Sequence, residues 1–188
     1  MRPSQKPHLT DITMDNYLTV SAVGEDAPKV NDAFTVAVRD CGCMIIEARI
    51  ARLGNNNALV MLLGGSWDAI AKVETSLTRL AEQHKMKIFI ERTKFPNTAA
   101  EYLPYAIEIV AVQHIDTMHA VVSFLTQRQA IIADLNCHTY TTNRTETQMM
   151  QLQIAVDLPA DTSIATIRGD FMDFCDQLNL DAIMEPAK

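Results

Sequence analysis

The chain has 188 residues, 48% of them hydrophobic, and a formal net charge of −7 at neutral pH. This supplies one sizeable core or two small ones, so we expect a globular protein. Lysine and arginine are scattered singly, and without a basic patch to neutralise phosphates we expect no direct binding of nucleic acid. No apolar run reaches the roughly 18 to 20 residues of a membrane span, and residues 1–15 lack a signal-peptide hydrophobic stretch, so the sequence predicts a cytoplasmic protein with no membrane contact.

The first half of the chain predicts the order strand, helix, hairpin, helix, strand. Alternating apolar and polar side chains favour strands, apolar residues at helical spacing favour helices, and the Gly-Asn-Asn-Asn turn favours a hairpin. Ser66 is a plausible cap for the second helix. The predicted segments are, in order, a strand at 17–23, a helix at 30–41, hairpin strands at 43–53 and 58–63, a helix carrying apolar residues at 70–81, and a strand at 86–91.

The second half repeats this order with almost no shared residues. Asp116 is placed to cap its first helix. The predicted segments are a strand at 105–112, a helix with apolar residues at 118–125, hairpin strands at 130–142 and 147–156, a helix with apolar residues at 164–178, and a strand at 180–185. Such a repeat is hard to obtain by chance. It predicts an α+β fold made of two ferredoxin-like βαββαβ modules, each a four-stranded antiparallel sheet with two helices on one face.

The repeat also divides the chain. We expect an N-terminal tail at 1–14, a first module at 15–92, a linker at 93–104 and a second module at 105–188. A module this small buries only around 60% of its unfolded surface, so docking on its sibling should add stability. We therefore expect the modules to pack against each other, with a ligand or partner at the seam.

The turn from the first strand into the first helix has two interpretations. The stretch contains Gly24, Asp26 and Pro28, followed by the helix. Glycine after a strand, an acid before the helix and proline at the first helical position are ordinary features of a helix start. A helix N-terminus is also a competent anion site, so a small ligand is the alternative.

No pattern indicates catalysis or metal binding. There is no nucleophile-elbow glycine pattern, no phosphate loop and no His-x-x-x-His spacing, so we expect neither an enzyme nor a metal or cofactor site. The cysteines lie in apolar segments without the spacing of a disulfide framework, and we interpret all of them as reduced core thiols. They are Cys41, Cys43, Cys137 and Cys175.

Two hairpin-containing units of this length, each with a strand-to-helix turn, resemble tandem ACT domains, the amino-acid-sensing regulatory module. A free-standing pair of this size most resembles the glycine cleavage system transcriptional repressor family. In that family the first turn reads roughly Gly-x-Asp-x-Pro-Gly; Gly24, Asp26 and Pro28 match it, and Lys29 stands where the last glycine belongs. The segment 42–45, Gly-Cys-Met-Ile, is similar to the family's x-Gly-Ile-Asn-Ile entry into strand two.

The resemblance implies a small amino acid, glycine or serine, as ligand at the turns. The implied ligand-binding residues are Gly24, Asp26, Pro28, Lys29 and Asn31 in the first module and Gln113, His114 and Asp116 in the second. The second turn has neither the proline nor a glycine, and the charge of Asp116 should repel an amino-acid carboxylate. The first turn is therefore the better candidate.

The resemblance further implies a repressor of glycine cleavage genes that contacts a DNA-binding activator of the LysR type. Two alternatives stay open. One is a metabolite sensor that docks on an enzyme; the other is a scaffold whose ligand pocket has decayed. A homodimer is compatible with either.

Overall fold

The structure is a computed structural model that describes residues 16–25, 29–94, 102–143 and 145–187. The chain divides into two compact units, residues 1–97 (unit 1) and 98–188 (unit 2), and each is described by itself. Unit 1 contains β1 (Asn16–Glu25), α1 (Val30–Asp40), β2 (Met44–Leu53), β3 (Asn56–Gly65), α2 (Trp67–Gln83) and β4 (Lys87–Thr93). Unit 2 contains β5 (Tyr102–Val112), α3 (Thr117–Gln127), β6 (Ile131–Thr141), β7 (Gln148–Pro159), α4 (Ile164–Gln177) and β8 (Asp181–Pro186). The predicted pair of βαββαβ units with an α+β fold is confirmed; docking of one on the other stays a prediction.

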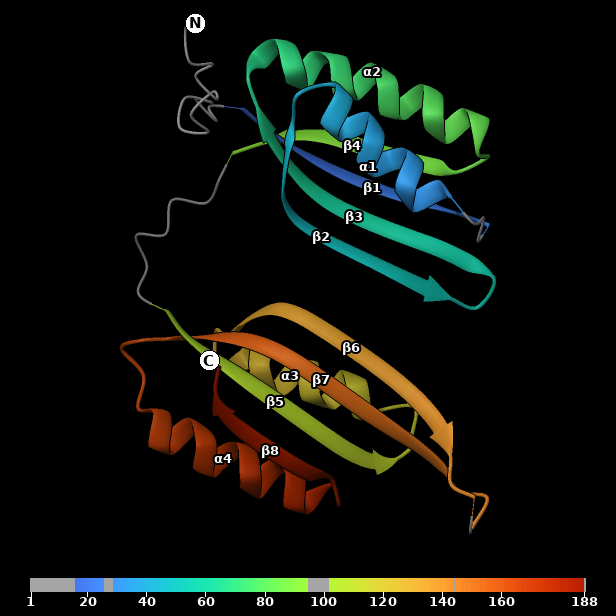
Figure 1. The fold of residues 1–188 in the computed structure, drawn as a ribbon. Helices are drawn as coiled ribbons and strands as arrows, with labels where there is room; N and C mark the ends of the chain where they lie inside the picture. The colour runs from blue at the N-terminus through green and yellow to red at the C-terminus, as the bar shows by residue number, and fades with distance from the viewer. Residues whose placement is uncertain (1–15, 26–28, 95–101, 144, 188) are drawn as a thin grey trace, which may run out of the picture. The chain divides into compact units, whose positions relative to one another are not determined.

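Unit 1 is one antiparallel sheet in the order β2-β3-β1-β4, with α1 and α2 on one face (Figure 1). The predicted alternation of its first strand is confirmed, because Leu18, Val20 and Ala22 are almost fully buried. From the helices, Phe34 of α1 and Ile70 of α2 pack into the same core. Strand β2, at the edge of the sheet, is exposed along its whole length.

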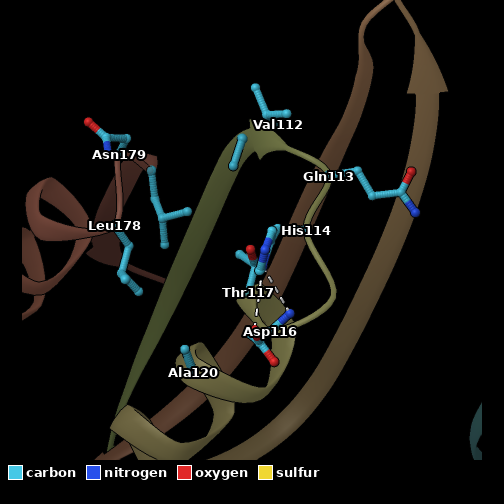
Figure 2. A pocket seen from close by; sticks show the side chains of 10 residues that line it. Val112, Gln113, His114, Asp116, Thr117, Ala120, Leu178 and Asn179 are labelled. Carbon is cyan, nitrogen blue, oxygen red and sulfur yellow. Dashed lines mark hydrogen bonds and ion pairs between the residues drawn. The ribbon is translucent and has the colours of Figure 1, made fainter.

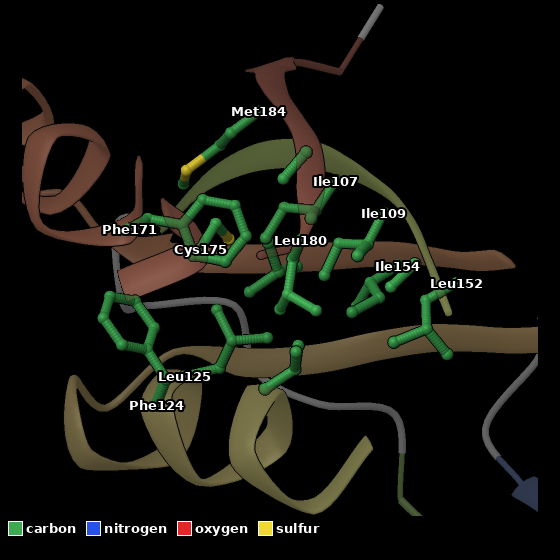
Figure 3. Packing of buried hydrophobic residues seen from close by; sticks show 14 of the residues in the cluster. Ile107, Ile109, Phe124, Leu125, Leu152, Ile154, Phe171, Cys175, Leu180 and Met184 are labelled. Carbon is green, nitrogen blue, oxygen red and sulfur yellow. The ribbon is translucent and has the colours of Figure 1, made fainter. Parts of the chain in front are cut away.

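Unit 2 repeats this sheet in the order β6-β7-β5-β8, with α3 and α4 on one face (Figure 1). Its core, shown in Figure 3, joins alternate residues of the sheet to the apolar stripe of α4. The Phe171 ring lies at its centre with no exposed surface, 5.5 Å from the ring of Phe124. Leu178, which the sequence pattern assigned to the stripe of α4, is the C-terminal cap of that helix and is 44% exposed.

Strand β5 begins at Tyr102, earlier than position 105 where the alternation starts, and β4 extends to Thr93. Both strands thus reach into the segment assigned to the linker; residues 95–101 lie outside the described part. Pro104 pairs with Asp157 of β7, and its carbonyl accepts a hydrogen bond from the Ala187 N–H at 3.0 Å. Proline is tolerated there because the strand uses the carbonyl and does not need the missing N–H.

The interpretation of all cysteines as core thiols is wrong for one of them. Cys43 and Cys175 are buried and Cys41 is half-buried, but Cys137 is exposed. Cys137 lies in β6, at the edge of its sheet. Apolar neighbours in the sequence do not reveal which strand stands at an edge.

Serine caps begin the second helix of each unit, as the sequence predicts for Ser66. The Ser66 hydroxyl accepts a hydrogen bond from the Ala69 N–H at 3.3 Å, and that of Ser163 accepts one from the Thr166 N–H at 3.4 Å. These bonds satisfy an N–H that has no partner within the helix.

Replacing Ser66 by alanine is expected to lower the free energy of unfolding by about 1 kcal/mol, because the Ala69 N–H loses its partner. Chemical denaturation followed by circular dichroism measures the change. Ser66→Asp is the matched control, since aspartate also accepts from the helix N-terminus and should keep most of the stability. Equal losses in both variants would show that the cap contributes nothing.

Candidate functional site

The first predicted site lies where β1 ends and α1 begins, and its glycine has a structural explanation. Gly24 pairs with Asn57 of β3. A Cβ at position 24 would stand 2.7 Å from the Met86 Cγ, closer than real Cβ atoms come, and 3.0 Å from the Met86 Cα. Packing against Met86 therefore favours glycine here, with or without a ligand. Asp26 and Pro28, the other two residues that match the family turn, lie outside the described residues.

Lys29, which stands where the family turn has a glycine, adopts a backbone conformation that favours glycine. It precedes α1 with φ 123° and ψ −5°, a region that favours glycine and strains other residues. Its side chain is exposed and makes no capping hydrogen bond. Position 29 thus combines a glycine-like backbone conformation with a lysine side chain.

Lys29→Gly is expected to stabilise unit 1 by about 1 kcal/mol. Relief of the backbone strain gains roughly 1–3 kcal/mol, and the greater conformational entropy of glycine in the unfolded chain offsets part of that gain. Denaturant titration of the full chain measures the gain. Lys29→Ala removes the same charge but keeps the strain, so it should give no gain. A stable Lys29→Ala variant equal to Lys29→Gly would contradict the strain.

Asn31 is fastened to the hairpin by a reciprocal amide pair. The Asn57 Nδ2 donates to the Asn31 Oδ1 at 2.7 Å, and the Asn31 Nδ2 donates back to the Asn57 Oδ1 at 3.4 Å. Asn57 is only 3% exposed. The pair fixes the first turn of α1 against the start of β3, so Asn31 is held in place beside the predicted site.

The second turn, between β5 and α3, is closed by a local hydrogen bond. The Asp116 N–H donates to the His114 Nδ1 at 3.3 Å, and the Asp116 Oδ2 lies 3.7 Å from the same nitrogen. Asp116 stands at the N-cap position as predicted, but its side chain makes no capping hydrogen bond, so that part of the prediction is wrong. Its backbone is helical (φ −89°, ψ −14°) rather than extended, and an N-cap carboxylate normally needs the extended form to turn back onto the helix.

A cavity of about 400 Å³ lies beside this second turn, between the end of β5, the start of α3 and the α4–β8 turn (Figure 2). We call it the unit 2 cavity. Gln113, His114 and Asp116, the three residues predicted from the second turn, all line it. Its other lining residues are Ala111, Val112, Thr117, Ala120, Leu178, Asn179 and Leu180.

The sequence pattern does not indicate the side chains that close this cavity. Thr117 belongs to no recognisable sequence motif, and Leu178 and Asn179 lie near the C-terminal end of unit 2, far from the second turn in the sequence. The backbone of Asn179 has φ 54°, a conformation that asparagine tolerates better than most residues. An asparagine just after the apolar stripe of α4 was the available indication of a tight turn there.

The described residues offer hydrogen bonding and apolar contact rather than a reactive group. Among them, no three or more His, Cys, Asp or Glu side chains are gathered so as to hold a metal ion. In the same part of the chain, none of the helices has the length and apolarity needed to cross a membrane. A cavity lined by aliphatic side chains with a few polar groups is typical of a binding site for a small molecule.

Comparison with known proteins assigns this fold. Residues 16–91 match the ACT domain family. Two solved structures share the fold across nearly the whole chain. One is a proposed glycine cleavage system transcriptional repressor, with a TM-score of 0.69, 24% identity and coverage of 94% of this chain and 99% of that one. The other is described as an unknown protein from Galdieria sulphuraria, with a TM-score of 0.73, 16% identity and coverage of 92% of this chain and 99% of that one. The molecule is a tandem ACT-domain protein.

A closer relationship comes from sequence. The chain is 30% identical over 172 residues to the glycine cleavage system transcriptional repressor of Escherichia coli (strain K12), an alignment that covers 89% of this chain and 88% of that protein. The repressor of Shigella flexneri matches to the same extent. The chain belongs to the glycine cleavage system transcriptional repressor family. Its role is therefore regulatory, and the resemblance inferred from the turn residues is confirmed.

Proposed function

We propose that this protein represses the glycine cleavage genes in response to a small amino acid, through contact with a transcriptional activator of the LysR type. The observation that carries the proposal is the 30% identity to the Escherichia coli repressor, which extends over almost the full length of both chains. The negative net charge supports contact with a protein rather than with DNA, because no basic patch is available for phosphates.

The effector in this proposal is glycine or serine, bound at the first turn by Gly24, Asp26, Pro28, Lys29 and Asn31. Two observations support this turn. The backbone of Lys29 keeps a glycine-like conformation despite its strain, and strained residues gather at binding sites. Asn31 is held by Asn57, so a polar side chain at the helix start is already ordered before a ligand arrives.

Gln113, His114 and Asp116 form the corresponding group at the second turn. Their place on the unit 2 cavity supports a binding role. The carboxylate of Asp116, however, opposes the carboxylate of an amino acid, so in our proposal glycine and serine bind at the first turn. An effector shifts the protein between two states only by binding them unequally.

A pull-down with a purified LysR-type activator of the glycine cleavage genes tests the proposal. The activator is expected to be retained on the immobilised full chain, and glycine or serine should change the amount retained. A strain without this protein should show raised expression of the glycine cleavage genes. Unaltered expression, together with no retention of the activator, would overturn the proposal.

The pull-down, together with a thermal-shift measurement of ligand binding, separates the two alternative functions. A sensor that docks on an enzyme would show a ligand-dependent thermal shift but would not retain the activator. A scaffold without a working pocket would show no shift, because a ligand stabilises its target by RT ln(1 + [L]/Kd) only where it binds.

A further inference from the structure

We propose that the unit 2 cavity binds a small primary amine with an aliphatic body, a ligand of different chemistry from glycine. This goes beyond the proposed function, since it concerns a second ligand and holds whether or not the first turn binds an amino acid. Three properties of the cavity carry the proposal: its size and apolar lining, the hydroxyl of a buried residue that lines it, and the charge of one lining residue.

The first property is size. The cavity volume of about 400 Å³ falls in the range of about 300–1,000 Å³ typical of small-molecule sites. Glycine or serine would leave most of it empty. The aliphatic lining residues come from all three sides, as Figure 2 shows for Val112 of β5, Ala120 of α3 and Leu178 after α4. An aliphatic group is needed to fill this space and release its water.

The second property is the hydroxyl of Thr117. This residue is only 7% exposed and lines the cavity at the first position of α3. Among the described residues, its hydroxyl has no hydrogen-bond partner, and every fully enclosed side-chain N or O atom has one. The Thr117 hydroxyl is therefore not fully enclosed, and Thr117 is one of the residues that line the cavity. Buried polar groups are nearly always hydrogen-bonded, so a ligand's polar group is its natural partner.

The third property is charge. Asp116 is the only Asp, Glu, Lys or Arg among the lining residues of the cavity, and its carboxylate is exposed. The N-terminus of α3 contributes a partial positive charge of about half an elementary charge, which the full negative charge of Asp116 outweighs. Two of the N–H groups at this helix start already have partners: that of Asp116 donates to the His114 Nδ1 at 3.3 Å and that of Thr117 to the His114 carbonyl at 3.4 Å. The site therefore disfavours a carboxylate and favours an ammonium group.

Isothermal titration of the full chain with three probes tests this ligand class. The probes are leucinamide, which has both the amine and the aliphatic body; leucine, which adds a carboxylate; and glycinamide, which lacks the body. Leucinamide is expected to bind more tightly than either of the others, by roughly ten-fold or more, through burial of its side chain and the absence of charge repulsion.

Two variants locate the binding. Asp116→Asn should remove the preference for leucinamide over leucine, and Thr117→Val, which keeps the shape but not the hydroxyl, should weaken leucinamide binding roughly five-fold. Asp32→Asn, which changes an exposed acid in the first turn of α1 in unit 1, is the matched control and should change nothing. Circular dichroism and thermal unfolding establish that each variant is folded.

Any one of three results would overturn the proposal. The first is no heat with leucinamide; the second is that leucine or glycinamide binds at least as tightly as leucinamide. The third is a preference for leucinamide over leucine that stays unchanged in Asp116→Asn. If Thr117→Val does not fold, the Asp116→Asn comparison still decides. Failure here leaves the response of the first turn to glycine and serine intact, and the reverse also holds, so the two proposals fail separately.

Discussion

Phe171→Ala is expected to lower the free energy of unfolding of unit 2 by about 3–5 kcal/mol, the usual cost of emptying a fully buried aromatic site. The Phe171 ring has no exposed surface and lies beside that of Phe124 (Figure 3), with ring centroids 5.5 Å apart. The Phe174 ring centroid lies 6.4 Å away, so neighbouring side chains cannot close the cavity without losing their own contacts. Since domains of this kind are stable by only about 5–15 kcal/mol, the variant should unfold at a much lower denaturant concentration.

The chain offers a built-in control for this experiment. Trp67, its single tryptophan, lies in α2 of unit 1, so its fluorescence follows that unit alone. In Phe171→Ala the transition of Trp67 should move much less than the transition of unit 2 seen by circular dichroism, because each unit has its own core. Equal shifts of both would contradict a chain built on two separate cores.

The stability of unit 2 is expected to fall by about 2 kcal/mol between pH 9 and pH 11, because of Cys175. Burial, aided by the neighbouring Asp176 carboxylate, raises the pKa of the Cys175 thiol from its ordinary value of 9.0 to about 11. As the pH rises, the unfolded chain releases this proton first while the folded chain still holds it. The contribution is therefore complete below pH 9 and lost as the pH passes through 11.

Urea denaturation of the full chain at pH 8 and pH 10.5 measures this loss. Cys175→Ala is the control, since it removes the thiol proton. Its free energy of unfolding should depend less on pH, because the cavity left by the missing thiol lowers stability equally at both pH values. A slope for Cys175→Ala identical to that of the unaltered chain would assign the alkaline loss to other groups.

The fold was predictable because its signals are local and occur twice. Alternation in β7 placed Met150, Leu152, Ile154 and Val156 inward, and all four are buried. The exposure of β2 was not predictable: its isoleucines and leucine suggest a core strand, yet Ile50 is 50% and Leu53 66% exposed. Whether a strand is buried depends on its place in the sheet and on how much of the sheet the helices cover. The residues of the strand alone do not contain that information.

The candidate sites divide in the same way. Gln113, His114 and Asp116 are near neighbours in the sequence, so the turn pattern found them together. The sequence predicts that Asn57 lies in a turn rich in asparagine; in the structure it is buried in β3 as the partner of Asn31. Thr117 and Asn179 line the same cavity although they lie far apart in the sequence. Pairings between distant segments come from packing, and a single sequence does not show them.

Titration of the full chain with glycine and with serine tests the central claim, that this pair of ACT domains responds to a small amino acid at its first turn. We expect saturable heat that disappears in Asp26→Ala and persists in Asp116→Asn. Absence of heat from both amino acids with the unaltered, folded chain would contradict it, as would binding that Asp26→Ala leaves unchanged.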